Sequence, residues 1–319
     1  MVINEFVKPK VGISTCLLGE AVRYNGGHKL DHYIRDTLGK FVDFVPICPE
    51  VEAGFGTPRE ALHLHETENG VVMLTEKSKE DLTEKMTSWS RNKLKEIEDI
   101  ELCGYIFKSK SPSCGVYRAR IQREEKGVNL NGRGLFAQEF ISAYPQLIVE
   151  EEGRLHDPVI RDNFIQNIFI NHRWNELNKN RSIRGLMKFH ESLKYSLMSH
   201  SPRILKEMGP IVANSNKIDT DEVFDLYKVK LVEALKELSD KKKNKNVLDH
   251  IMGYFKNNLD KSEKAELKEV INNYYNGLLP IIVPITLLNH YVKKYDDIYL
   301  QGQFYLNPHP LELMLRNHV

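Results

Sequence analysis

Three stretches of this sequence decide the fold: VGISTC (residues 11–16), FVPIC (residues 44–48) and GYIFKSKSPSC (residues 104–114). Each is a short apolar run that leads into a turn rich in glycine, proline or serine, with a cysteine just beyond the run. Short apolar runs bounded by turn residues predict buried strands. Ligands of open α/β sheets collect beyond the carboxyl ends of the strands. We therefore expect thiols from three separate strands to converge at one edge of a sheet.

The same alternation of apolar runs and helical periods continues to about residue 150. Strands are expected at 11–15, 41–47, 71–74 and 104–107, and helices at 79–97 and 135–143. Strands that alternate with helices favour βαβ units and a parallel sheet. Residues 1–156 are therefore predicted to form an α/β domain with a mainly parallel sheet.

The strand signal fades in the second half, where apolar residues recur at helical spacing. Residues 157–319 are therefore predicted to form an all-α domain. The basic run KKKNK (residues 241–245) is expected to be a solvated loop between two helices. The helices are expected at 161–175, 183–200, 202–213, 220–239, 247–259, 261–276 and 284–294.

Composition limits the class of protein. The 319 residues are 41% hydrophobic and 28% charged, with a net charge of +1, which is ordinary for a globular protein. Four cysteines do not resemble a secreted disulfide scaffold. The longest apolar run, 278–288, is too short for a bilayer and contains two prolines, and no signal peptide is apparent. We expect a cytoplasmic protein in a reducing compartment with no membrane partner.

The spacing of the cysteines narrows their chemistry. No Cys-x-x-Cys occurs, which argues against a thioredoxin-like pair and a zinc ribbon. Cys16, Cys48 and Cys114 could together hold an iron–sulfur cluster or another thiophilic metal centre. Three protein ligands would leave one coordination position open for a substrate. Cys103 is expected at the start of a strand, away from the crevice, as a core residue.

Two polar residues accompany these cysteines. Glu50 follows Cys48 by two residues and could act as a general base for a water molecule. Ser111 precedes Cys114 by three residues and could orient a substrate or pass a proton. The structural alternatives are that Glu50 caps a helix that begins near Val51 and that Ser111 satisfies a turn.

The motifs CLLG with RYNG, CPE with a following PR, and SPSCG resemble the signature of the thiouracil desulfidase family. Residues 189–209, 280–291 and 301–310 resemble the helical domain that is fused to one branch of this family, the tRNA 4-thiouridine desulfidases. The resemblance covers nearly the whole chain.

The resemblance implies a [4Fe-4S] cluster held by Cys16, Cys48 and Cys114. It also implies catalytic roles for Glu50 and Ser111. The reaction implied is a net hydrolysis without redox change, in which 4-thiouridine in tRNA becomes uridine and sulfide is released.

A thiolated tRNA would be the partner of both domains, because affinity for nucleic acids comes mostly from phosphate contacts spread over a surface. The candidates for holding the base or a nearby phosphate are Arg23, Tyr24 and Arg59, which could instead be packing or ion-pair groups. Basic side chains at helical spacing could contact tRNA or simply form a solvated helix face. These are His190, Lys194, His200, Arg203 and Lys206.

Two other functions remain open. The first is a desulfidase of free thiouracils or thionucleosides, in which the helical domain serves oligomerisation. The second is a non-enzymatic iron–sulfur sensor or tRNA-binding module.

Overall fold

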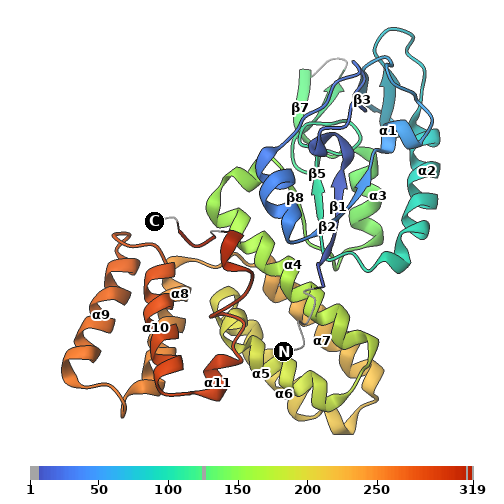
Figure 1. Ribbon diagram of the computed structural model, residues 1–319. Helices are drawn as coiled ribbons and strands as arrows, with labels where there is room; N and C mark the ends of the chain where they lie inside the picture. Colours follow the sequence, from blue (N-terminus) through green and yellow to red (C-terminus); the bar gives the residue numbers. More distant parts are fainter. Residues whose placement is uncertain (1–6, 124–126, 314, 318–319) are drawn as a thin grey trace. The chain divides into compact units, whose positions relative to one another are not determined.

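Four parallel strands form the sheet that positions the cysteines (Figure 1). Their spatial order is β2-β1-β5-β8, with all three neighbouring pairs parallel. The chain leaves the central strand β1 toward β2 and later returns to the other side of β1 as β5. The strands comprise β1 (Lys10–Ser14), β2 (Asp43–Ile47), β5 (Tyr105–Phe107) and β8 (Val149–Glu151).

A second four-stranded sheet was not expected. Its order is β4-β3-β6-β7, and only the β3–β6 pair is parallel. The expected strand at 71–74 is present as β4, but it pairs antiparallel with β3 in this second sheet. The strands comprise β3 (Leu62–Thr67), β4 (Gly70–Thr75), β6 (Ala119–Arg123) and β7 (Gly127–Gly132).

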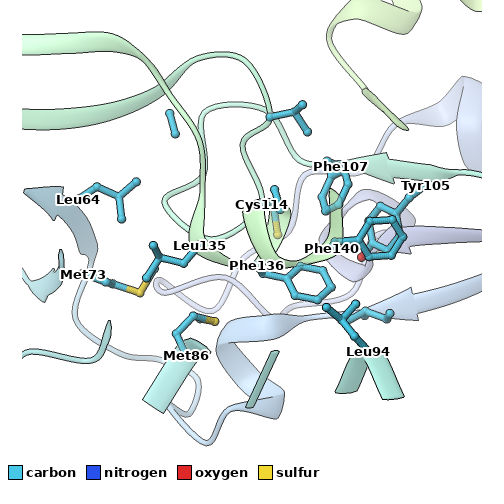
Figure 2. Close-up of a cluster of buried hydrophobic side chains, with 14 of the residues drawn as sticks. Leu64, Met73, Met86, Leu94, Tyr105, Phe107, Cys114, Leu135, Phe136 and Phe140 are labelled. Carbon is cyan, nitrogen blue, oxygen red and sulfur yellow. The ribbon is translucent and has the colours of Figure 1, made fainter. Parts of the chain in front are cut away.

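An aromatic core joins the parallel sheet to helices α2 (Thr83–Glu96) and α3 (Leu135–Ala143). Tyr105 and Phe107 alternate along β5, so both rings lie on the same face and stack with centroids 4.0 Å apart. Phe136 and Phe140 of α3 meet this pair edge-on or tilted. Cys114 belongs to the same buried cluster (Figure 2). The third cysteine loop is therefore anchored in the core, where each large apolar side chain contributes about 1.5–3 kcal/mol.

The structure is a computed structural model that describes residues 7–123, 127–313 and 315–317. The chain divides into two units, Met1–Asp157 and Pro158–Val319. None of the helices in the described part of the chain is long and apolar enough to cross a membrane. Short helical segments include η1 (Thr15–Leu18), α1 (Pro49–Glu52) and η5 (Arg154–His156).

The second unit is helical, as expected, so the predicted fold class is confirmed. Two helical groups, α5–α6–α7 and α8–α9–α10, each enclose an apolar core. The helices are α4 (Pro158–Lys179), α5 (Ile183–His200), α6 (Pro202–Ala213), α7 (Thr220–Lys236), α8 (Lys241–Met252), α9 (Lys261–Tyr275), α10 (Ile282–Lys294) and α11 (Ile298–Gln301).

One expectation about this unit is wrong. The basic run 241–245 is not a loop but the beginning of α8. Asp240 is the N-cap, and its side chain accepts a hydrogen bond from the backbone N–H of Lys243 at 2.7 Å. Aspartate is among the strongest N-cap residues, and lysine is a good helix former, so this local chemistry favours a helix.

Candidate metal centre

The three cysteines follow the carboxyl ends of three adjacent strands. Cys16 lies in η1 after β1, Cys48 directly follows β2, and Cys114 lies in the loop after β5. All three are free thiols and line a single cavity of about 580 Å³. The cavity lies at the point where the strand order reverses, which is where open α/β sheets bind ligands. The convergence expected from the sequence is therefore present.

Local hydrogen bonds and backbone conformation fix the positions of the first two cysteines. The carbonyl oxygen of Cys16 accepts hydrogen bonds from the N–H groups of Gly19 (3.4 Å) and Lys29 (2.9 Å). Gly19 is in the left-handed conformation (φ 98°), which ends the short 3-10 turn. Cys48 is the N-cap residue of α1, and its N–H donates to Oε1 of Glu52 at 2.9 Å. The two thiols are thus fixed by the turns in which they lie.

The third cysteine loop docks on the beginning of α3. The carbonyl oxygens of Pro112 and Ser113 accept the N–H groups of Leu135 and Ala137, both at 3.1 Å. A helix leaves its first N–H groups without partners in the helix, so this loop supplies them. Gly134 permits the contact, since a Cβ there would lie only 2.4 Å from the carbonyl carbon of Ser113.

Glu50 lies in α1 and is held from two directions. Its Oε2 accepts hydrogen bonds from Nε (3.1 Å) and Nη2 of Arg59, and its Oε1 accepts one from the Ser113 hydroxyl at 2.9 Å. The side chain is 16% exposed and lines the cavity. It does not cap α1 but lies inside this helix, which begins at Pro49 after the N-cap residue Cys48. The structural alternative for Glu50 is therefore wrong.

Ser111 has a defined hydrogen-bonding role. Its Oγ accepts the N–H groups of Ser113 (3.2 Å) and Cys114 (3.1 Å), so it does satisfy a turn. A hydroxyl has two acceptor lone pairs and one donor. With both lone pairs in use, Ser111 can act toward the cavity, which it lines, only as a hydrogen-bond donor.

Several residues that shape the site were not predicted from the sequence. Lys108 lines the cavity and forms an ion pair with Glu152, which also accepts the N–H of Ser109 at 2.6 Å. Glu151 Oε1 accepts the N–H of Val116 at 2.7 Å. Consecutive glutamates at the end of β8 thus fix the third cysteine loop on both sides of Cys114. The run EEE (residues 150–152), which directly follows the apolar residues 147–149, could have indicated this role.

Burial keeps the thiols protonated in the absence of a metal. Burial, with a smaller contribution from the nearby Cys48, raises the pKa of Cys16 to about 12, although Lys108 and Arg23 oppose the shift. Burial also raises the pKa of Cys48, and it raises that of Cys114 well above its usual range. Thiols must lose their protons to bind a metal. Loading of this site would therefore release protons.

The donor set is of the kind that binds an iron–sulfur cluster. Within the described residues, no three His, Cys, Asp or Glu side chains are grouped closely enough to hold one metal ion. In an iron–sulfur cluster the thiolates bind different irons, so their sulfur atoms lie farther apart than the ligands of one ion. Cys16, Cys48 and Cys114 supply three soft sulfur donors around one cavity. Cys103 is buried (1% exposed) away from the cavity lining, as expected of a core residue.

Two of the three expected substrate-binding residues line the cavity and have solvent-exposed side-chain surface. Arg23 and Tyr24 line it, and the Arg23 guanidinium lies 5.5 Å from the centroid of the Tyr24 ring, which is 41% exposed. The Arg59 side chain also lines the cavity but is only 6% exposed and is bound to Glu50.

In the helical unit, the buried histidines do not form the expected face. His200 is fully buried, and its Nδ1 lies 2.7 Å from the carbonyl oxygen of Glu237. The expectation that His200 contacts tRNA is wrong, because helical spacing does not reveal which face points inward. His190 is half-buried, with Nδ1 3.2 Å from the Tyr227 hydroxyl.

The other three basic residues differ in how exposed and how free of ion-pair partners their charged groups are. Lys206 is exposed. Lys194 is half-buried, with Nζ 5.3 Å from the centroid of the Tyr195 ring. Arg203 is 62% exposed, but its charge is compensated by the carboxylates of Glu207, Glu233 and Glu237.

A cavity lined by three free cysteines at the switch point of a parallel sheet defines an α/β protein with a candidate sulfur-ligand site. Comparison with known proteins identifies its family. A family model described as 2-thiouracil desulfurase matches residues 11–152, and one described as a protein of unknown function (DUF1722) matches residues 194–310. Through residues 11–152, the chain belongs to the 2-thiouracil desulfurase family.

Individual relatives match about half of the chain. YbbK of Bacillus subtilis (strain 168) is 32% identical over 151 residues, which cover 44% of this chain and 95% of YbbK. YbgA of Escherichia coli (strain K12) is 29% identical over 158 residues, which cover 49% of this chain and 94% of YbgA. Both are described as uncharacterized. A solved structure of TudS, described as a [4Fe-4S]-dependent thiouracil desulfidase, is 28% identical and covers 47% of this chain and 95% of TudS, with a TM-score of 0.37.

Proposed function

We propose that this protein is an iron–sulfur-dependent desulfidase that converts 4-thiouridine in tRNA to uridine and sulfide in the cytoplasm. The observation that carries the proposal is the convergence of three free cysteines, Glu50 and Ser111 on one cavity. This convergence occurs in the unit that belongs to the 2-thiouracil desulfurase family.

Cys16, Cys48 and Cys114 would hold a [4Fe-4S] cluster. With three protein ligands, such a cluster supplies an iron with an open coordination position, a thiophilic Lewis acid for the thiocarbonyl sulfur. Lys108 and Arg23 lie close enough to Cys16 to affect its ionisation and would offset part of the negative charge of the thiolates.

Glu50 is the general base of the proposed mechanism, and its contacts identify the reacting atom. Oε2 is occupied by two N–H groups of Arg59, whereas Oε1 accepts only the Ser113 hydroxyl among the contacts described. A carboxylate oxygen has two lone pairs, so Oε1 retains one for a water molecule. Glu50 Oε1 would remove the proton from the water that attacks C4 of the base.

Ser111 supplies a hydrogen bond to the substrate. Because its lone pairs are occupied by two N–H groups, its hydroxyl can only donate. It would donate to the polar edge of the base and orient the thiocarbonyl carbon toward the water. Water contributes its oxygen to the new carbonyl, the carbon–sulfur bond breaks, and sulfur leaves as hydrosulfide. No electron is gained or lost.

The charges around the cavity support an anionic substrate. Its lining includes six lysine or arginine residues but only one acidic residue, Glu50. Lys29, Lys110 and Arg120 are exposed in this lining and are available for phosphates. A cavity of about 580 Å³ is also within the usual range for ligands larger than a single base. In the helical unit, Lys206 and Lys194 are the remaining candidates for contacts with tRNA.

The test is an anaerobic assay of the full-length protein reconstituted with iron and sulfide. Thiolated tRNA and free 4-thiouracil are compared as substrates, and sulfide release and loss of the thionucleoside absorbance are measured. Cys48→Ala is the control for dependence on the cluster. We expect preferential turnover of tRNA, abolished in Cys48→Ala. An intact cluster with unchanged thionucleoside content would refute the proposal.

One observation favours a second candidate, a desulfidase of free thiouracils. Every residue that lines the cavity lies between Ser14 and Arg120, within the first unit. A small thiouracil could therefore be bound by this unit without the helical unit. Equal turnover of the free base and thiolated tRNA would favour this candidate.

A further inference from the structure

We propose that Arg59 is a positioning residue: through Glu50 and Ser113 it holds the three cysteine loops in one arrangement, and it is not a substrate contact. The inference rests on the proposed function for the identity of the group that the cysteines hold. It differs from the role expected for Arg59 from the sequence, which was to bind the base or a phosphate.

Most hydrogen-bond donors of the Arg59 guanidinium already have partners within the protein. A guanidinium has five N–H groups. Nε and Nη2 donate to Glu50 Oε2, and Nη1 lies within hydrogen-bond distance of the carbonyl oxygens of Val22 (3.1 Å) and Gly56 (2.7 Å) and of Thr57 Oγ1 (3.3 Å). At most one N–H remains, and the side chain is only 6% exposed. A phosphate would therefore have to displace these partners.

The same contacts join the first two cysteine loops. Val22 belongs to the loop after Cys16, whereas Arg59 follows Cys48. The backbone N–H of Arg59 also donates to the Tyr24 carbonyl at 2.8 Å, so main chain and side chain hold the same loop. The Val22 carbonyl oxygen that accepts Arg59 lies 4.0 Å from Sγ of Cys48. A shift of Arg59 would therefore move the Val22 carbonyl group that lies next to this thiol.

Ser113 extends the chain of contacts to the third loop. It precedes Cys114 and is fully buried, and its hydroxyl donates to Glu50 Oε1 at 2.9 Å. Val22, Arg59, Glu50 and Ser113 thus form a continuous hydrogen-bonded chain across all three loops. We call these four residues the loop latch. Hydrogen bonds to ionised groups are about twice as strong as neutral ones, which suits a buried latch.

The latch has a consequence for the metal centre. The cysteines lie in three separate loops, so their relative positions depend on contacts between the loops. Partners of this kind, which orient metal ligands without binding the metal, typically affect metal affinity or activity by about 10- to 100-fold. Loosening the latch should weaken retention of the cluster and should turn Glu50 away from the water that it activates.

The experiment uses the full-length protein with Arg59→Lys and Ser113→Ala. Lysine keeps the positive charge but lacks the planar fork that binds Glu50 and Val22 together. The matched control is Arg91→Lys, because Arg91 also binds a glutamate, Glu139, but is 63% exposed. Each protein is reconstituted anaerobically, and two quantities are measured without substrate: iron per chain, and the rate of iron release to a ferrous chelator.

We expect faster iron release by about 10- to 100-fold in Arg59→Lys, a smaller change in Ser113→Ala, and wild-type behaviour in Arg91→Lys. Per loaded cluster, Arg59→Lys should lower kcat for thiolated tRNA with KM unchanged, which a purely stabilising role would not produce. Wild-type iron retention in both variants, with a raised KM in Arg59→Lys, would overturn the proposal and restore Arg59 as a substrate contact.

Two further results keep the test decisive. If Arg59→Lys does not fold, Ser113→Ala alone decides, because removing one hydroxyl leaves the ion pair in place. If the wild-type protein binds the cluster but shows no desulfidase activity, the proposed function is refuted. The iron content and the rate of iron release still test the role of the loop latch in that case.

Discussion

Gly134→Ala should detach the third cysteine loop from the beginning of α3. An added Cβ would lie 2.4 Å from the carbonyl carbon of Ser113, 2.5 Å from its oxygen and 2.8 Å from the backbone nitrogen of Cys114. These are backbone atoms, so no side chain can rotate away. The φ of Gly134 is −69°, which any residue adopts, so the effect is one of contact alone.

The size of the effect follows from these distances. Ordinary contacts of a Cβ lie at 3.4–4 Å, so the loop must move by about 1 Å. Overpacking of this kind costs about 1–3 kcal/mol. The shift also stretches the hydrogen bonds that Leu135 and Ala137 donate to the loop, and each is worth about 1 kcal/mol. We expect the free energy of unfolding to fall by about 3 kcal/mol, which lowers the urea midpoint by about 1–3 M.

The assay can follow the first unit by itself. The protein has two tryptophans, Trp89 in α2 and Trp174 in α4. In a Trp174→Phe background, fluorescence therefore reports only Trp89, whose ring lies 5.7 Å from that of Phe136 in the first turn of α3. Urea unfolding of Gly134→Ala and its parent is compared by this signal, and iron per chain is measured after reconstitution.

The matched control is Gly153→Ala. Gly153 lies in the same unit with φ −63° and ψ −32°, and the nearest atom to an added Cβ, Ser109 Oγ, is 3.7 Å away. This substitution should be neutral or stabilise the protein by about 0.4–1 kcal/mol. If Gly134→Ala matches Gly153→Ala in both urea midpoint and iron content, the docking of the loop on α3 is not what fixes Cys114.

Three other predictions test the site and the helical unit. Glu50→Gln, which cannot take a proton from water, should lower turnover per cluster by about 10²–10⁴-fold in the sulfide-release assay; near-normal turnover would remove its role as base. Cys16→Ala should reduce iron per chain and Cys103→Ala should not; equal losses would contradict the three-cysteine assignment. Burial lowers the pKa of His200 below its usual 6.5, so the unfolded chain takes up a proton first as pH falls, and stability decreases below that value. His200→Gln should flatten this decrease in urea midpoints measured above and below pH 6.5, and an unchanged slope would assign it to other groups.

Much of the fold could be predicted because its signals are local. The bounds of α5 and α6 agree with the predicted ranges, and both helices begin after a serine N-cap, Ser182 and Ser201. The cysteines could be placed at one sheet edge because parallel strands bring their carboxyl ends together. The second sheet was not predicted because its strands mix apolar with charged or polar residues, as in ARIQR of β6 and GVNLNG of β7.

The contacts inside the site could not be predicted in the same way. Ser113 and Glu50 are 63 residues apart, and Lys108 and Glu152 are 44 apart, so no short motif joins them. His200 shows the opposite difficulty. Its spacing suits an exposed basic face, yet the packing of α5 buries it completely. Sequence spacing indicates which residues share a face, whereas tertiary packing decides whether that face meets solvent.

The charges of the cavity are best understood with the thiols ionised. Six cationic residues and one carboxylate leave the lining strongly positive while the cysteines are neutral. Arg59 is compensated by Glu50 and Lys108 by Glu152, so the uncompensated charge is that of the residues nearer to solvent. Three cysteine thiolates would add three negative charges among the buried and half-buried residues of the lining. The remaining positive charge would then lie at the rim, where a polyanionic substrate would first meet the protein.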